Sequence, residues 1–456
     1  MYPQLTTLPY QQDAALRYFA SFANKPWSML LHSGYSGHSS SRYDIFVALP
    51  EVTLITYNGV TRICSGNECK WSKDDPFLLV QKQLEKMHGI VPVNNELPFQ
   101  GGALGFFSYD LIRSIEILPA LAKNDLSLPE MAIGIYKWAV IVDHFRRLVT
   151  LVSYDKRITS SLLTQLTAEI FLSPMPFNIL DNWKLNMSRS EYSDKFFQVQ
   201  RHLLAGDCYQ VCLSQRFSAP YSGDEWTAFL HLLTYNQAPF SAFIRLKEHI
   251  VISFSPERFL HVQHGKIQTC PIKGTLPRLK DIDEDHQQVF HLVNSAKDQA
   301  ENLMIVDLLR NDIGRVAKPG SVHVPSLFKI ETYATVHHMV STISAVLPKN
   351  RTPCDLLRAC FPGGSITGVP KIEAMKTIER LEPQRRSVWS GSIGYISYCG
   401  TMDTNIAIRT LLVLDQHVYC SVGSGLVADS NEKKEYQEIL AKAASLLPLL
   451  KRLNHV

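Results

Sequence analysis

The sequence predicts an α+β protein built on an antiparallel β-sandwich. Strand patterns follow one another in runs with few helices between them, an order that favours antiparallel sheets over a parallel, doubly wound sheet. The 456 residues are enough for two or three ordinary domains, or for one large composite domain with an ample core. Hydrophobic residues make up 45% and charged residues 19%, which is typical of a soluble globular protein.

The first half of the chain is predicted to be rich in strands. One amphipathic helix is expected at 75–87. Residues 99–109 hold three glycines without the spacing of a dinucleotide-binding loop. They predict a strand and a turn whose backbone lies close to another backbone segment. Apolar and β-branched runs predict strands at 27–32, 43–48, 52–57 and 138–152.

A weakly patterned connection at 155–183 separates the two halves, and we place a domain boundary there. This divides the chain into an N-terminal, strand-rich region at 1–155 and a second domain at 183–452. The second domain opens with a helix, because Ser188 and Glu191 form a capping box ahead of an apolar stripe.

The remaining elements of the second half alternate between strands and two long helices. The helices are predicted at 285–309 and 429–450, the latter capped by Asp429 and Glu432. Strands are predicted at 207–217, 321–324, 335–345, 390–397, 405–414 and 418–422.

Residues 251–278 carry the most informative chemistry in the chain. An apolar run ends in Ser-Pro-Glu-Arg at 255–258, and a predicted hairpin then leads to Pro-Ile-Lys-Gly-Thr at 271–275. Glu257 and Lys273 are therefore expected near the ends of two paired strands. A poorly solvated lysine can lose its proton and act as a nucleophile, although the same octapeptide is compatible with a surface lysine beside a turn.

Two acidic pairs on separate predicted helices are candidates for a metal site. Asp298 and Glu301 lie three residues apart on one helix, and Glu435 and Glu438 repeat this spacing on the other. Mg²⁺ takes one or two carboxylates together with waters and an oxygen of an anionic substrate. Solvated helix faces often show the same pattern, so the spacing alone leaves both interpretations open.

Several classes of partner are not expected. The net charge of +4 is small for this length and no basic stripe stands out, so nucleic acid is not predicted. No apolar stretch approaches the about 18 residues that span a bilayer, and the N-terminus lacks the features of a signal peptide, so we expect a cytoplasmic protein. The nine cysteines are scattered without zinc spacing, which predicts free buried thiols in a reducing compartment.

Ser-Pro-Glu-Arg-Phe at 255–259 and Pro-Ile-Lys-Gly-Thr at 271–275 resemble the chorismate-utilising enzymes, and among them the aminodeoxychorismate synthases. The resemblance covers essentially the whole chain. It implies a large antiparallel β-sandwich flanked by helices, the anthranilate synthase component I-like fold. It also implies conversion of chorismate and ammonia to 4-amino-4-deoxychorismate, in para-aminobenzoate and folate biosynthesis, with Mg²⁺ as the cofactor.

The resemblance implies a role for each matching residue. Lys273 would form a covalent intermediate at C2 of chorismate, and Glu257 would act first as acid and then as base. His338 would lie near the C4 hydroxyl. Glu301 and Glu438 match the Mg²⁺ ligands, with Asp298 and Glu435 behind them. The glycine-rich run at 361–371 would shape the floor of the pocket, and the substrate would contact Thr275, Tyr395, Arg409, Gly423, Gly425 and Lys442.

Two positions distinguish the branches of the family. Anthranilate synthases carry alanine where this chain has Lys273, and isochorismate and salicylate synthases carry a water-activating lysine where it has Gln210. Anthranilate synthase component I is the first alternative. A non-catalytic tryptophan-binding subunit is the second, but the residues matching the chorismate pocket are all present.

The resemblance also implies two binding partners. No cysteine lies in a tight Gly-x-Cys-x-Gly elbow, so a separate glutaminase subunit is expected to supply ammonia within a heterodimer. The N-terminal half matches an amino-acid pocket that holds L-tryptophan in several relatives, although the same residues are compatible with a core-lining strand and loop. The matching residues are Ser33, Ser40, Ser41, Arg42, Tyr43, Pro239, Phe240 and Ser241.

Four positions depart from the pattern of the family. Ser40 stands where an aromatic residue is frequent, and Ser424 stands where glycine is common. Cys212 replaces a frequent asparagine, and Cys270 a common arginine near Lys273. We expect the last two to bear on the rate of the reaction.

Overall fold

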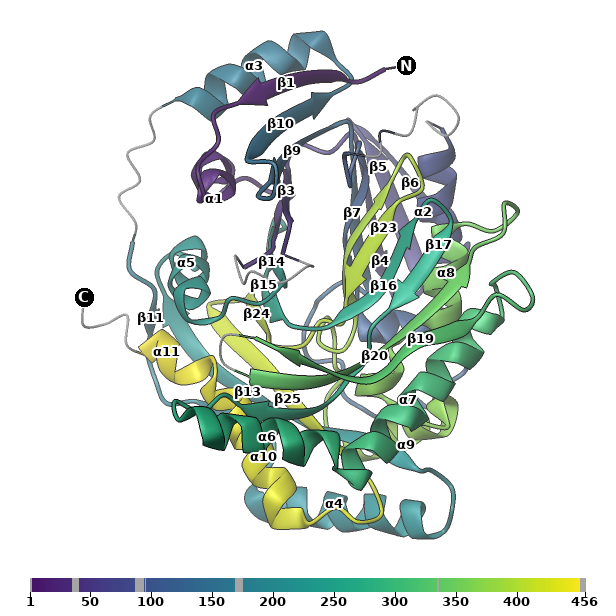
Figure 1. The fold of residues 1–456 in the computed structure, drawn as a ribbon. Helices are drawn as coiled ribbons and strands as arrows, with labels where there is room; N and C mark the ends of the chain where they lie inside the picture. Colours follow the sequence, from purple (N-terminus) through teal and green to yellow (C-terminus); the bar gives the residue numbers. More distant parts are fainter. Residues whose placement is uncertain are drawn as a thin grey trace.

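Two large antiparallel sheets face each other, and helices cover their outer faces (Figure 1). The computed structural model describes residues 2–34, 41–86, 94, 96–168, 175–333 and 336–451. This arrangement confirms the predicted α+β class. Within the described residues, no helix is long and apolar enough to cross a membrane.

The first sheet joins strands from both halves of the sequence. Two short strands, β12 (Lys184–Leu185) and β21 (Gly368–Val369), lie outside its main strand order. Both pair with β13 (Gln210–Ser222). The order across the sheet is β1 (Gln4–Leu8), β10 (Leu148–Ser153), β9 (Trp138–Asp143), β3 (Tyr43–Val47), β2 (Ser28–His32), β14 (Phe240–Arg245), β15 (Ile250–Ser255), β24 (Thr410–Leu414), β25 (His417–Leu426), β13 (Gln210–Ser222) and β11 (Asn178–Ile179).

The second sheet is built in the same mixed way. Strand β19 (His323–Thr332) pairs with β20 beside the main path. The order is β18 (Ile272–Pro277), β20 (Val336–Val346), β17 (Lys266–Thr269), β16 (Arg258–Gln263), β23 (Met402–Asn405), β22 (Ser392–Ser397), β7 (Gly102–Phe107), β8 (Met131–Tyr136), β4 (Val52–Tyr57), β5 (Val60–Ser65) and β6 (Glu68–Ser72).

The helices divide between the outer faces of the two sheets. Two short 3₁₀ helices, η1 (Tyr109–Ser114) and η2 (Gly364–Ile366), lie in the connections. The second sheet is covered by α2 (Pro76–Glu85), α6 (Ile282–Val293), α7 (Ala296–Gly314) and α8 (Pro353–Cys360). The first sheet is covered by α1 (Ala14–Phe19), α3 (Lys156–Thr167), α4 (Arg189–Leu204), α5 (Glu225–Tyr235), α9 (Lys371–Leu381), α10 (Glu432–Ala444) and α11 (Leu447–Lys451).

Apolar side chains fill three layers. One lies between the sheets and includes Phe106, Ile141 and Val251, and the other two lie beneath the helices on either side. Burial of such large side chains is the main favourable contribution to folding.

The predicted boundary at 155–183 does not separate two bodies in space. In the first sheet β14 pairs with β2, so that Ser241 lies opposite His32. In the second sheet β22 pairs with β7, so that Tyr395 lies opposite Leu104. Residues 1–155 and 183–452 therefore share both sheets.

Several predicted elements differ from the structure. The strand expected at 138–152 is the hairpin of β9 and β10, which turns at Arg147 with a positive φ of 54°. The helix expected at 285–309 is two helices, because Asn294 ends α6 and the Ser295 side chain caps α7. The last helix begins later than predicted, with Asn431 as its cap.

Two of the cysteines predicted to be free are joined in the structure. Strands β5 and β6 form a hairpin in which Cys64 lies directly opposite Cys69, and a disulfide links them. The prediction missed it because cross-strand pairing depends on where the hairpin turns. The other seven cysteines are free.

Candidate active site

Lys273 lies at a bulge in β18, the edge strand of the second sheet. Ile272 pairs with Val340 and Thr275 pairs with His338, so the register shifts between them. A bulge changes the direction of the side chains beside it. Gly274 makes this turn possible, because it has a φ of +79° and a Cβ there would lie 2.8 Å from Cδ1 of Leu292.

The Lys273 amine reaches from the second sheet to the first. Its Nζ lies 4.0 Å from Oε2 of Glu301 on α7, and the side chains of both residues are only 15% exposed. A Cβ on Gly425 of β25 would stand 3.2 Å from the same Nζ and 3.2 Å from Cδ of Gln210. The glycine at 425 thus leaves room for both side chains.

The Gln210 side chain is an unsatisfied polar group beside that amine. Gln210 is fully buried at the start of β13, and neither its Oε1 nor its Nε2 has a hydrogen-bond partner among the described residues. Buried amides are normally hydrogen-bonded, since burial without a partner costs about 1–3 kcal/mol. A polar ligand in contact with Lys273 would supply the missing partner.

Glu257 lies just before β16 and is only 6% exposed. Burial raises the pKa of its carboxyl to about 7, against the opposing effects of a hydrogen bond from the Ser365 hydroxyl, the charge of Lys273 and the Ile272 amide. The carboxyl is therefore poised to give and take a proton near neutral pH, as a general acid and base must.

Thr275 and His338 sit side by side beyond the bulge. The Thr275 hydroxyl and Nδ1 of His338 are 2.8 Å apart across the β18–β20 pair, and the imidazole packs edge-on against Tyr333. The predicted substrate residue and the predicted catalytic histidine are thus in direct contact.

Two cationic side chains meet near the Gly423 carbonyl of β25: Arg409, just before β24, and Lys442 on α10. The Lys442 amine donates to the Gly423 carbonyl at 3.0 Å and pairs with Glu438 at 2.6 Å. Arg409 donates to the Lys442 carbonyl at 2.6 Å, and burial lowers its pKa. Four predicted residues therefore gather here on neighbouring elements.

The two predicted acidic pairs converge from α7 and α10. Burial raises the pKa of Glu301 against the attraction of Lys273 and Lys297, and Asp298 and Glu435 add to the rise. Burial alone would raise the pKa of Glu438 as well. The positive charge of Lys442 and its hydrogen bond, with smaller effects from Lys273 and Lys297, outweigh burial, so the pKa of this carboxyl is lowered.

Glu301 and Glu438 fit a magnesium ion. The charges of Lys273 and Lys297 act on both carboxylates, and Glu435 on α10 also acts on Glu301. In the described part of the chain, no cluster of three or more His, Cys, Asp or Glu side chains could hold a metal by itself. Two carboxylates completed by water and an anionic substrate are the donor set that Mg²⁺ accepts.

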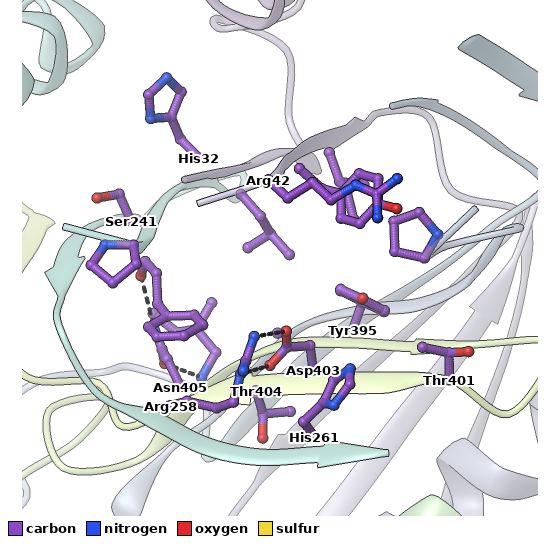
Figure 2. Close-up of a pocket in the computed structure, with 18 of the residues that line it drawn as sticks. His32, Arg42, Ser241, Arg258, His261, Tyr395, Thr401, Asp403, Thr404 and Asn405 are labelled. Atoms are coloured by element: carbon purple, nitrogen blue, oxygen red, sulfur yellow. Dashed lines mark hydrogen bonds and ion pairs between the residues drawn. The ribbon is translucent and has the colours of Figure 1, made fainter. Parts of the chain in front are cut away.

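A separate pocket of about 160 Å³ lies between the two sheets (Figure 2). Its walls come mainly from β2, β3 and β14 of the first sheet and from β16, β22 and β23 of the second. Five of the residues predicted to bind tryptophan line it: Arg42, Tyr43, Pro239, Phe240 and Ser241. Ser33 is held by Asp44, Ser41 is not among the lining residues, and Ser40 lies outside the described residues.

The structure differs from the prediction for Tyr395. This residue was expected to contact chorismate, yet it lines the pocket between the sheets, where Figure 2 shows it near Asp403. The physical reason is its strand, because β22 belongs to the layer between the sheets and the Tyr395 ring packs edge-on against Phe99 at 5.4 Å.

Two groups of residues were missed by the sequence reasoning. Arg258 and Asp403 form a two-bonded ion pair at 2.9 and 3.0 Å in the wall of the pocket between the sheets. Arg258 directly follows Glu257, so the signal lay within the recognised motif. Ser365, whose hydroxyl lowers the pKa of Glu257 against the effect of burial, lies in the glycine-rich run and carried no signal of its own.

Comparison with known proteins identifies the family of the chain. Residues 36–448 match the model of the chorismate binding enzymes, and the chain belongs to that family. Within the family it groups with the component 1 proteins of aminodeoxychorismate synthase, as the resemblance predicted. It is 54% identical to the one from Klebsiella aerogenes over 445 residues, covering 98% of both chains.

Two further relatives extend the comparison. The chain is 53% identical to aminodeoxychorismate synthase component 1 of Escherichia coli over 451 residues, covering 99% of both chains. Its fold matches the crystal structure of anthranilate synthase component I from Streptococcus pneumoniae with a TM-score of 0.79 and 30% identity, over 89% of this chain and 92% of the other.

Proposed function

We propose that this chain joins ammonia to C4 of chorismate and forms 4-amino-4-deoxychorismate, as the names of its relatives indicate. The observation that carries the proposal is the position of Lys273. Its amine lies in a sheltered space beside the unsatisfied amide of Gln210, and its charge acts on the Glu257 carboxyl. The resemblance gives anthranilate synthases an alanine at this position, which lacks the amine.

The reaction proceeds in two substitutions at conjugated carbons. The lone pair of the Lys273 amine bonds to C2, the two ring double bonds shift, and the C4–O bond breaks as Glu257 donates a proton so that water leaves. Ammonia then bonds to C4, the double bonds shift back, and Lys273 leaves C2 while the Glu257 carboxylate accepts a proton from the incoming nitrogen. Covalent catalysis thus divides one difficult substitution into two easier ones.

The other residues hold and orient the substrate. Arg409 and Lys442 supply positive charge for its carboxylates, and the backbone of β25 at Gly423 and Gly425 allows close approach. In this proposal Thr275 and His338, whose side chains are in contact, form a polar pair for the C4 hydroxyl. Glu301 and Glu438 would hold Mg²⁺, which when bound offsets the negative charge of a substrate carboxylate.

The ammonia comes from a partner subunit in this proposal. The relatives carry the name component 1, which implies a second component, and we assign that role to a glutaminase. Free ammonia replaces it in the test tube, because the chemistry at C4 needs only the neutral nucleophile.

The test is product analysis of the purified chain. The protein is incubated with chorismate, Mg²⁺ and ammonium at pH 8 to 9, with and without aminodeoxychorismate lyase, and the products are identified by mass spectrometry. We expect 4-amino-4-deoxychorismate alone, 4-aminobenzoate when the lyase is present, and loss of turnover in Lys273→Ala. Anthranilate and pyruvate without the lyase would instead identify an anthranilate synthase.

We further propose that the pocket between the sheets binds L-tryptophan. Its aromatic walls, Tyr43, Phe240 and Tyr395, suit an indole, and Arg42 and Asp403 offer charges for the carboxylate and ammonium groups. Mass spectrometry of the denatured protein and calorimetric titration with L-tryptophan test this. Absence of bound amino acid, together with no heat on titration, would leave the pocket without this ligand.

A further inference from the structure

Helix α6, which follows β18 in the sequence, is fastened to the protein by two inward side chains. Asp285 and Leu292 are its buried residues, in a helix that the structure describes from end to end. Its larger apolar side chains, those of Ile282, Phe290 and Val293, are exposed. Packing of an apolar face is what usually holds a helix to its sheet, so α6 depends on Asp285 and Leu292 instead.

The Asp285 carboxylate joins α6 to the neighbouring strands. It accepts hydrogen bonds from Nε of Arg278, at 2.8 and 3.0 Å, and from the backbone amide of Leu279 at 2.8 Å. Nε2 of His337 on β20 lies 3.0 Å from the same carboxylate, and Nδ1 of that ring lies 2.9 Å from the Thr332 hydroxyl on β19. One carboxylate thus ties α6 to the end of β18, to β20 and, through the imidazole, to β19.

The Asp285 carboxylate stays charged in any ordinary buffer. Hydrogen bonds from Leu279, His337 and Arg278 lower its pKa to about 2 against the effect of burial. Hydrogen bonds with an ionised partner are stronger than those between neutral groups. A change of residue 285 or of one of its partners is therefore needed to release α6.

Leu292, the second inward residue of α6, lies against the bulge of β18. A Cβ at Gly274 would lie 2.8 Å from Cδ1 of Leu292 and 3.1 Å from Cβ of Asp298. Gly274 directly follows Lys273, whose amine lies 4.0 Å from Oε2 of Glu301. Helix α6 therefore packs on the backbone next to the proposed nucleophile.

We propose that Asp285 is a positioning residue for Lys273. The carboxylate holds α6 against β18 and β20, and α6 in turn holds Leu292 on Gly274. The bulge then keeps the amine beside Glu301. This rests on the role of nucleophile that the proposed function gives to Lys273.

The first test measures the ammonia-dependent turnover of Asp285→Asn. Asparagine has nearly the same shape, but it is uncharged and its amide nitrogen cannot accept a hydrogen bond from Arg278. We expect kcat to fall about 10-fold while the KM for chorismate changes less than about 2-fold, because the position of a nucleophile acts on the transition state. Leu292→Ala should lower kcat in the same way, and the double variant should be little worse than Asp285→Asn alone.

The second test follows α6 itself by hydrogen exchange and needs no turnover. In Asp285→Asn the amides of residues 282–293 should exchange about 10-fold faster, because the helix has lost its polar attachment. The amides of residues 305–314 in α7 should keep their rates. A general loss of stability would instead raise exchange in both segments.

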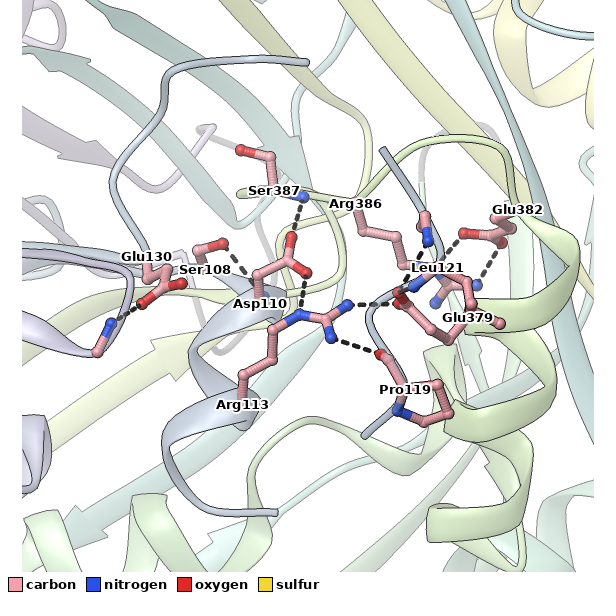
Figure 3. A network of polar contacts seen from close by, with 12 residues as sticks. Ser108, Asp110, Arg113, Pro119, Leu121, Glu130, Glu379, Glu382, Arg386 and Ser387 are labelled. Atoms are coloured by element: carbon pink, nitrogen blue, oxygen red, sulfur yellow. Dashed lines mark hydrogen bonds and ion pairs between the residues drawn. The ribbon is translucent and has the colours of Figure 1, made fainter. Parts of the chain in front are cut away.

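Asp110 is the matched control, because it is a second buried aspartate with similar partners (Figure 3). Its carboxylate accepts from Nε of Arg113 at 3.3 Å and from the backbone amide of Ser387 at 2.8 Å. Arg113 also donates to Glu379, so this network joins η1 to α9 rather than α6 to β18. Asp110→Asn should lose stability to denaturant as Asp285→Asn does, but keep its kcat and the exchange rates of α6.

An unchanged kcat in Asp285→Asn would overturn the proposal, whatever the exchange of α6. An equal loss of kcat in Asp110→Asn would also overturn it, as would strictly additive losses in the Asp285→Asn, Leu292→Ala double variant. If Asp285→Asn does not fold, Arg278→Gln takes its place, since Arg278 is partly exposed and only one partner is then lost. Failure of the proposed function is a different result, in which the unaltered chain yields no 4-amino-4-deoxychorismate.

Discussion

Glu257 and Arg258 are neighbours in the sequence, yet they serve two different pockets. The Glu257 carboxyl is buried beside Lys273, whereas the Arg258 guanidinium lines the pocket between the sheets in contact with Asp403. Successive residues of an extended chain point to opposite sides, so one dipeptide reaches both spaces. The burial that suits Glu257 for acid–base chemistry also has a cost for folding.

Glu257→Gln should stabilise the fold at alkaline pH while it removes activity. The pKa of Glu257 is raised from 4.5 to about 7, so the folded state loses stability relative to the unfolded state as pH rises through this interval. The difference amounts to about 3 kcal/mol. Denaturation of the variant at pH 8 should show most of this gain, and at pH 4.5 almost none.

Glu68→Gln on β6 is the matched control, because Glu68 is exposed and its substitution should leave the pH dependence unchanged. A Glu257→Gln protein with the same pH dependence of unfolding as the unaltered chain would contradict the raised pKa.

The residues of the site were predictable to different degrees. Glu257 and Lys273 were found because their motifs are short and chemically unusual, and the structure places them together. Tyr395 was misplaced, since a motif does not show which layer of a sandwich its strand faces. Ser365 was missed, because a serine in a glycine-rich run has no distinguishing chemistry until its neighbour is known.

At the scale of elements, the bulge in β18 determines where the lysine points. It depends on Gly274, because the positive φ and the nearby Leu292 and Asp298 side chains disfavour any other residue there. Helix α7 lies against this point, and Asn302 fixes it to β20 through the Met339 carbonyl and the Ser341 hydroxyl. The helix that carries Glu301 is thereby set in register with the strand that pairs with β18.

Gly274→Ala should damage both stability and catalysis. A left-handed backbone costs a non-glycine residue about 1–2 kcal/mol, and the contacts with Leu292 and Asp298 add strain of about the same size. Gly320→Ala is the control, because Gly320 has a φ of +74° with open space around it. We expect Gly274→Ala to lose about 2 kcal/mol more in denaturation and to lower kcat, and Gly320→Ala to keep its kcat.

Equal losses of stability in the two variants would show that the surroundings of Gly274 do not matter.

The sequence indicated the elements on either side of this bulge but not the bulge itself. The helix break at Asn294 and Ser295 was hidden for a similar reason, since the apolar periodicity continues across it.

At the scale of the whole molecule, the two halves of the chain form one interleaved structure. Strands before residue 155 and strands after residue 183 pair with each other in both sheets. The sequence predicted the class and the strands, because alternation and composition are local properties. It did not predict the strand order, because pairing between distant segments leaves no local trace.

Fragments divided at the predicted boundary should not fold separately. Chains 1–182 and 183–456 each lack partners for central strands, so neither should unfold cooperatively by circular dichroism. Expressed together they should assemble, because the missing pairings are then available. A cooperative transition in either fragment alone would show that the halves are independent.

The interleaving also bears on how the protein is made. When β2 and β7 leave the ribosome, β14 and β22, with which they pair, have not yet been synthesised. The nascent chain therefore carries open strand edges, which are prone to wrong association. Translation must deliver β24 and β25 before either the first sheet or the part of the site that bears Arg409 can close. The candidate active site can therefore form only after β25 has been synthesised.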